Sequence, residues 1–139
     1  MEQVDMAAEV GAQFIVSPNV KREVIQETIR KEMVSMPGAM TATEAVEAAE
    51  YGADFVKIFP AAILGAAYIK AIRSPINHIP LLAVGGVNEK NIAQFMKAGA
   101  SGVGVGGDLV NPKWIAGGEF EKIKETAEAL VQSIGGKKE

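Results

Sequence analysis

The sequence contains no cysteine, only one histidine and few aromatic residues, which make up 6% of its 139 residues. The lack of cysteine excludes disulfide bonds and thiolate metal sites, and it is compatible with a reducing compartment. No group of histidine and acidic residues has the spacing of a metal site, so we expect no bound metal. Lysine and arginine are not clustered and the net charge is −3, so we expect no nucleic-acid partner.

Long apolar runs are also missing. The first residues are acidic and lack a basic flank followed by an apolar stretch, so we expect no signal peptide, no membrane contact and a cytoplasmic location. The chain does have a hydrophobic content of 48%, enough for a buried core, and a length that suits one domain. We expect that domain to cover residues 1–135, and we expect a charged tail, 136–139, to fray.

Apolar, strand-like segments alternate with amphipathic, helix-like segments along the chain. Strands are expected at 13–16, 32–36, 54–60, 79–84 and 102–105, and helices at 2–10, 21–31, 41–50, 63–72, 88–98 and 119–134. Pro37 and Gly38 are expected to end the second strand, Thr41 and Glu44 to form a capping box, and Asn88 to cap a helix. The strand centres are about 20 to 27 residues apart with one helix between them, which predicts βα units and a parallel sheet.

Five such strands are too few for a closed eight-stranded barrel, which usually needs about 200 residues or more. The residues therefore leave two possibilities, an open sheet or part of a barrel. A partial barrel exposes the free edges of strands 13–16 and 102–105, and such edges favour association. If the chain folds alone, we expect an open curved sheet that needs a partner.

The segment 54–60 carries a lysine inside an apolar strand. Side chains alternate across a strand, so Phe55, Lys57 and Phe59 share one face. One interpretation is a lysine near a strand end whose ammonium reaches water. The other is a nucleophilic amine, because an apolar site lowers the pKa of lysine and the neutral amine can condense with a carbonyl to form a Schiff base.

Two glycine pairs directly follow predicted strands, Gly85-Gly86 and Gly106-Gly107. In barrels of βα units, the loops after the last two strands commonly bind phosphate through backbone N–H groups, and glycine lets the backbone approach the anion. Ordinary tight turns are the alternative for either pair alone. The chain has neither a P-loop nor a dinucleotide-binding fingerprint, and His78 is expected at the surface.

Five motifs resemble those of one enzyme family in order and spacing: 12–18, 36–41, 56–61, 84–88 and 102–107. That family is the bacterial 2-keto-3-deoxy-6-phosphogluconate (KDPG) and 4-hydroxy-2-oxoglutarate (KHG) aldolases. The resemblance covers almost the whole chain. It implies a class I aldolase on a (β/α)8 barrel, of which this chain matches about five βα units, strands four to eight. It also implies cleavage of a keto acid to pyruvate and an aldehyde, a homotrimer, and no metal or organic cofactor.

The resemblance also implies roles for individual residues. Lys57 is the expected Schiff-base lysine and Phe59 lines its pocket. The predicted substrate-binding set further comprises Pro18, Gly85, Gly86, Gly106 and Gly107. Val84 stands where many members have threonine and Gly107 where many have serine. Both changes remove hydroxyl donors, which predicts weaker phosphate binding and favours the smaller, unphosphorylated substrate.

Family members carry about seventy to eighty further residues before the point that matches Met1. These residues supply a proton-shuttling glutamate, an arginine for the substrate carboxylate and a Gly-Thr element near the same end of the substrate. General acid–base assistance typically contributes 10²–10⁴-fold. Two alternatives therefore stand beside the aldolase: a catalytically silent remnant that keeps Lys57 without its proton shuttle, and a phosphate-binding barrel module that uses only the glycine loops.

Overall fold

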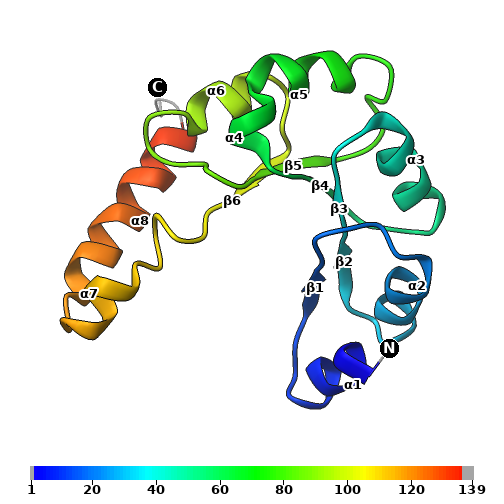
Figure 1. Ribbon diagram of the computed structural model, residues 1–139, viewed down its shortest axis with the longest axis horizontal. Coiled ribbons are helices and arrows are strands. Elements are labelled where there is room, and N and C mark those ends of the chain that lie inside the picture. The colour runs from blue at the N-terminus through cyan, green and yellow to red at the C-terminus, as the bar shows by residue number, and fades with distance from the viewer. Residues whose placement is uncertain (1, 136–139) are drawn as a thin grey trace.

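The computed structural model describes residues 2–135, which form a curved α/β arch (Figure 1). The predicted fraying of 136–139 lies outside the described residues. The helices are α1 (Glu2–Glu9), α2 (Arg22–Arg30), α3 (Ala42–Glu50), α4 (Ala61–Leu64), α5 (Ala66–Arg73), α6 (Ile92–Lys97), α7 (Pro112–Ala116) and α8 (Phe120–Ile134). The strands are β1 (Phe14–Val16), β2 (Val34–Met36), β3 (Gly38–Ala39), β4 (Val56–Ile58), β5 (Leu81–Val84) and β6 (Gly102–Gly104).

All the strand pairs of the described chain are parallel. β1 pairs with β2, and a second sheet runs β3-β4-β5-β6 in chain order. Pro37 alone separates β2 from β3, and its carbonyl accepts a hydrogen bond from the Lys57 N–H at 2.9 Å. The prediction that this strand ends at Pro37 is confirmed, since β2 stops at Met36, whereas Gly38 does not lie in a turn but begins β3 opposite Lys57. A Cβ at Gly38 would lie 2.5 Å from the Pro18 carbonyl oxygen, so only glycine fits there.

The hydrophobic core lies between the sheet and the helices on the outer side of the arch (Figure 1). Val56 and Ile58 of β4 and Leu81 and Ala83 of β5 are fully buried and point to this side. Helix α8 joins the core through Leu130, which is also buried. Burying an aliphatic side chain contributes roughly 1.5–3 kcal/mol, so this layer stabilises the fold.

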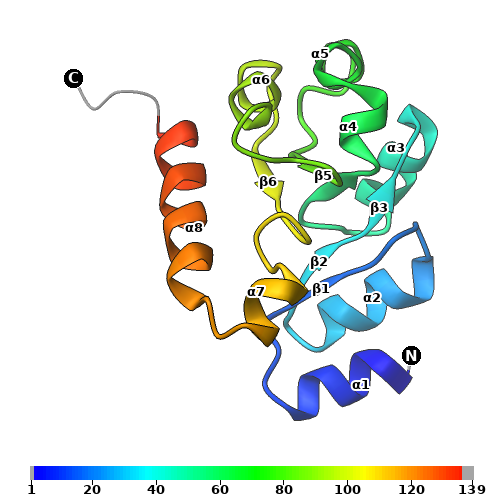
Figure 2. The ribbon, with the colours of Figure 1, turned by 60° about the vertical axis from the view of Figure 1, so that its left-hand side comes forward.

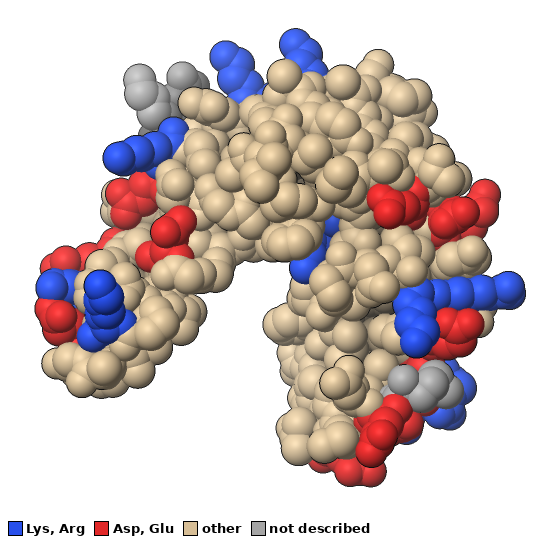
Figure 3. All heavy atoms as spheres, in the orientation of Figure 1, with Lys and Arg blue, Asp and Glu red and all other residues tan. Residues whose placement is uncertain are grey.

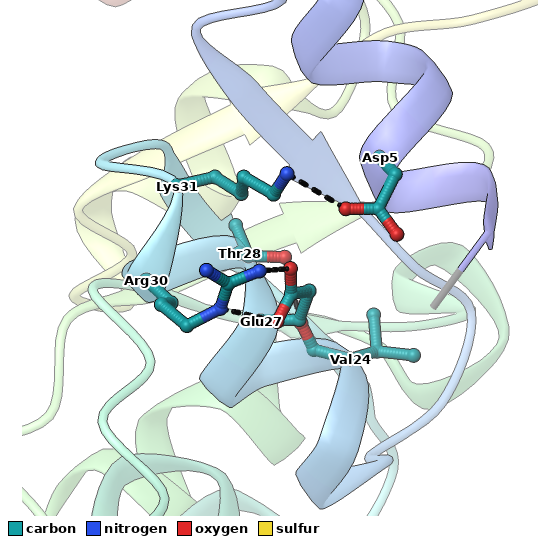
Figure 4. Close-up of polar contacts among 6 residues, drawn as sticks. All are labelled: Asp5, Val24, Glu27, Thr28, Arg30 and Lys31. Atoms are coloured by element: carbon teal, nitrogen blue, oxygen red, sulfur yellow. Dashed lines mark hydrogen bonds and ion pairs between the residues drawn. The ribbon is translucent and has the colours of Figure 1, made fainter.

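Polar contacts tie the first helix to the second. α1 lies beside α2 (Figure 2), and Lys31, just after α2, forms an ion pair with Asp5 of α1 at 2.8 Å (Figure 4). The hydrogen bond from Lys31 holds the pKa of Asp5 below its ordinary value. Glu27 is buried and accepts two hydrogen bonds from Arg30, which keeps its charge paired. The Asp5–Lys31 ion pair therefore connects α1 to the end of α2, whereas the Glu27–Arg30 pair lies within α2.

Several helix boundaries follow the sequence and others do not. The capping box is confirmed: the Glu44 N–H donates to the Thr41 hydroxyl, and the Glu44 carboxylate accepts from the Thr41 N–H. The predicted helix 63–72 is divided in two, because Gly65 adopts φ +81° between α4 and α5. The prediction that Asn88 caps a helix is wrong, since α6 begins at Ile92 after Asn91.

The loop before α6 explains that shift. The Asn88 side-chain oxygen accepts from the Lys90 N–H at 3.0 Å, which closes a local turn. The Asn91 side-chain oxygen accepts from the Asn88 N–H at 2.8 Å. Helix α7 was not predicted, and it has proline at its first position and an Asn111 cap. Such short helices have too few residues to show a hydrophobic period.

The arch is open. Over residues 2–135 the strands do not close into a barrel, and β1 and β6 each have one hydrogen-bonded neighbour. Figure 3 shows a hollow between the two arms whose walls carry mainly uncharged side chains. Phe14 and Val16 of β1 are about half exposed on this inner side, at 56% and 49%. No helix within the described range is long and apolar enough to cross a bilayer.

Candidate active site

Lys57 lies at the centre of β4 and points away from the helices. Its neighbours Val56 and Ile58 are buried against the outer layer, so strand alternation directs the lysine to the inner side of the arch. Its register partners are Gly38 on β3 and Leu82 on β5. The position of Lys57 is therefore set by the most buried strand of the sheet.

The lysine side chain is only 8% exposed although it faces the open side. Its amine lies 4.9 Å from the centroid of the Phe59 ring, so the two share one face as predicted. Burial lowers the pKa of Lys57 below its ordinary value, because a charged ammonium loses hydration there. Within residues 2–135 it forms no ion pair. The arrangement resembles a nucleophilic amine more than a lysine that reaches bulk water.

The turn after β5 packs against the turn after β4. A Cβ at Gly85 would lie 2.9 Å from Cδ2 of Phe59, and a Cβ at Gly86 would lie 2.5 Å from Cβ of Ala62. The Gly85 carbonyl accepts a hydrogen bond from the Ala62 N–H at 2.9 Å. Both glycines have positive φ, at +96° and +71°. Close packing and backbone conformation therefore explain why this turn contains two glycines.

The other predicted binding residues follow β6 and β1. Gly106 and Gly107 follow β6 and are exposed, and a Cβ at either would meet nothing within 4 Å. Pro18 follows β1 and lines a cavity of about 540 Å³ between α1, β1 and α2, together with Val4 and Ile15. The structure thus places Phe59 against Lys57 and Gly85 against Phe59. The Pro18 carbonyl packs against Gly38, the register partner of Lys57.

The predicted site lacked two wall residues, Leu82 and Val84. They alternate with the buried Leu81 and Ala83 on β5 and so face the inner side, half-buried. A Cβ at Gly102 would lie 3.1 Å from Leu82, and one at Gly104 would lie 2.9 Å from Val84. The alternation of side chains along this strand is the signal in the sequence that could have identified them.

A loop contact also escaped prediction. The Tyr68 hydroxyl on α5 donates a hydrogen bond to the Met40 carbonyl in the loop after β3. The same loop is held by Glu44, whose carboxylate accepts from the Met40 N–H at 2.8 Å. Hydrogen bonds from Met40 and Thr41 hold the pKa of Glu44 below its ordinary value. Among the described residues, no three histidine or acidic side chains gather as a metal site.

Comparison with known proteins identifies the class. The model of the KDPG and KHG aldolase family matches residues 1–126, so the chain belongs to that family. It is 43% identical over 133 residues to the 2-dehydro-3-deoxy-6-phosphogalactonate aldolase of Escherichia coli K12. It is 31% identical over 137 residues to the 2-dehydro-3-deoxy-phosphogluconate aldolase of Treponema pallidum. These matches cover 95% and 97% of this chain but only 63% and 65% of the two relatives. The chain therefore spans less than two thirds of their length.

Solved structures agree with the fold. A native KDPGal structure has a TM-score of 0.88 at 42% identity, covering 95% of this chain and 63% of that one. The KDPG aldolase from Legionella pneumophila has a TM-score of 0.85 at 27% identity, covering 93% and 63%. That structure holds pyruvate captured at low pH as a covalent carbinolamine intermediate.

Proposed function

We propose that this chain carries the covalent chemistry of a class I aldolase, with Lys57 as the nucleophile. The observation that supports it most is a buried lysine, with a lowered pKa, on the inner side of a parallel sheet. Membership in the KDPG and KHG aldolase family adds to it. The carbinolamine of the Legionella pneumophila relative is the species such an amine forms with pyruvate.

The chemistry runs through the Lys57 amine. Its nitrogen lone pair attacks the C2 carbonyl carbon of a 2-keto acid and gives a carbinolamine, which loses water to form an iminium. The C4 hydroxyl of the substrate then loses its proton, the C3–C4 bond breaks, and an aldehyde leaves. The electron pair of that bond moves into the iminium and forms an enamine. Protonation at C3 and hydrolysis release pyruvate and restore the free amine.

Two features of the site suit these steps. The low exposure of Lys57 raises the fraction of neutral amine, which is the nucleophilic form. The face of Phe59 stabilises positive charge close to it, which favours the iminium that replaces the ammonium. Leu82 lies beside the lysine in the register and extends the apolar wall.

The proposed substrate is a 2-keto-3-deoxy sugar acid with a 6-phosphate. The relatives from Escherichia coli and Rhizobium meliloti, at 43% and 41% identity, are named for the galactonate form, which makes that form the first to test. Gly106 and Gly107 present an exposed backbone after β6, which suits a phosphate. The unphosphorylated 4-hydroxy-2-oxoglutarate is the alternative, because Val84 and Gly107 offer no hydroxyl.

A silent remnant is the second candidate. In the described part of the chain Lys57 has no acidic ion-pair partner that could relay protons. By resemblance the proton-shuttling glutamate belongs to the segment that this chain does not match. A chain without such a glutamate would turn over about 10²–10⁴-fold more slowly, whereas it could still form the Schiff base. The homotrimer implied by the family stays a prediction.

Pyruvate release tests the function. The chain is incubated with 2-keto-3-deoxy-6-phosphogalactonate, its gluconate epimer or 4-hydroxy-2-oxoglutarate, and pyruvate is followed with a coupled dehydrogenase. We expect release from at least one substrate and none with Lys57→Met. A covalent pyruvate adduct without release selects the remnant. Release that survives in Lys57→Met contradicts the role of this lysine.

A further inference from the structure

The turn after β5 packs directly against the Phe59 ring. We propose that Gly85 is a positioning residue, whose missing side chain leaves the space in which the Phe59 ring lies against Lys57. Gly85 acts here through Phe59 and does not itself touch the amine. The inference deepens the proposed function and rests on it.

Three distances carry the proposal. The Lys57 amine lies 4.9 Å from the Phe59 ring centroid. On the side of the β5 turn, a Cβ at Gly85 would lie 2.9 Å and 3.0 Å from two ring carbons of Phe59 and 3.2 Å from the Pro60 Cα. Real Cβ atoms essentially never come within 2.9 Å of another heavy atom, and the other two contacts are tighter than most, so a methyl group at this position displaces the ring or the backbone.

The turn itself has little freedom to move away. The Gly85 carbonyl is bound to the Ala62 N–H, and Gly86 is in close contact with Ala62, because a Cβ there would lie 2.5 Å from that of Ala62. The adjoining β5 strand is paired on both sides. Phe59, by contrast, is 40% exposed and lies just after the end of β4. The ring is therefore the group that shifts, and we expect it to move toward the open hollow and off the lysine.

Displacement of the ring has a defined effect on the amine. The ring contributes apolar cover, which disfavours the ammonium, and a π face, which favours it. Burial lowers the pKa of Lys57, and we infer that loss of cover outweighs loss of the π face, because water that reaches the amine hydrates the ammonium directly. Water reaching the amine then raises its pKa toward the ordinary value. The neutral fraction at a fixed pH falls accordingly.

The test measures the titration of Lys57 without any substrate. Full-length chain is labelled with acetic anhydride between pH 6 and 11, and the acetylation of Lys57 is compared by mass spectrometry with that of the exposed Lys113. The variants are Gly85→Ala, Phe59→Ala and the double variant. Gly11→Ala is the matched control, because Gly11 has φ +81° but a Cβ there meets nothing within 4 Å.

We expect Gly85→Ala to raise the labelling midpoint of Lys57 by about half a pH unit or more, roughly a threefold loss of neutral amine below the midpoint. Gly11→Ala leaves that midpoint unchanged. With alanine at position 59, adding Gly85→Ala changes the midpoint by less than about 0.2 units, because the two changes act through one ring. Equal shifts with and without the ring, or no shift in Gly85→Ala, overturn the proposal.

Folding provides a second measurement. If Gly85→Ala does not fold, Phe59→Ala in the same chain should restore folding, because it empties the space that the methyl group needs. A double variant that still fails to fold, while Gly11→Ala folds, overturns the proposal. Acetylation needs no keto acid, so this test is independent of the proposed function. If the chain never binds pyruvate, the aldolase proposal is refuted, and the role of Gly85 is still decided by the labelling midpoints of Lys57 in the variants.

Discussion

The two faces of the curved sheet differ in what covers them. On the outer face, Val56 and Ile58 are fully buried beneath the helices. On the inner face, Phe14, Val16 and Phe59 are 40 to 56% exposed. The same strands thus contribute to stability through one set of side chains and present the other set to the hollow. Lys57 is buried although it lies on the inner face, which is why we propose it as the reactive group.

The largest expected effect is on the inner face. Lys57→Met keeps the volume of the side chain and removes the amine, so pyruvate release from any substrate should fall to the background rate. The free energy of unfolding at pH 7 should stay equal or rise, because methionine needs no hydration in a buried position. Thermal melting measures stability beside the coupled pyruvate assay. A variant that loses stability as well as pyruvate release would contradict this prediction, because it would show that Lys57 contributes to the stability of the fold.

A pair of identical substitutions compares the faces directly. Val56→Ala removes two fully buried methyl groups and should cost about 2 kcal/mol, by transfer and cavity terms together. Val16→Ala removes the same groups from a side chain that is half exposed, and should cost less than about 0.5 kcal/mol. Denaturant unfolding of the two variants measures both values. Equal costs would show that the inner face is covered in solution.

The smallest expected effect is a pH dependence of stability. The pKa of Lys57 is lowered in the folded chain relative to the unfolded one. Below the folded pKa both states carry the charge, so burial of the ammonium costs its full free energy there. Between the folded pKa and about 10.5 the unfolded state binds more protons, so stability rises with pH in that window. The difference in the free energy of unfolding between the chain and Lys57→Met should therefore increase with pH in this window. A difference that does not change with pH would show that the Lys57 amine is hydrated in the folded chain.

Local sequence rules predicted the parts of this molecule that depend on neighbours in the chain. The alternation around Lys57 identified the strand, which covers 56–58 of the predicted 54–60, and placed Lys57 and Phe59 on one face, but it left open whether the lysine reaches water. The capping box at Thr41 and Glu44 was also correct. Parallel pairing followed from the spacing of the strands, and the family match agrees with the resemblance.

Contacts between distant segments were not predictable in this way. The approach of Gly85 to Phe59 joins residues 26 positions apart, and neither residue type signals it. Pro37 and Gly38 were expected to close the strand together, yet Gly38 pairs with Lys57 in the second sheet. Asn88 and Asn91 both suit a cap, and competing turn hydrogen bonds decide between them. In each case a tertiary or turn contact overrode a sound local rule.

Trapping of pyruvate tests the central claim most directly. The folded chain is incubated with pyruvate and sodium borohydride, which reduces an iminium to a stable secondary amine, and the modified residue is located by peptide mass spectrometry. We predict the mass of one reduced pyruvate on Lys57 and unmodified chain in Lys57→Met. Labelling spread over exposed lysines such as Lys113, or no adduct on folded protein, would contradict the assignment of Lys57 as the Schiff-base nucleophile.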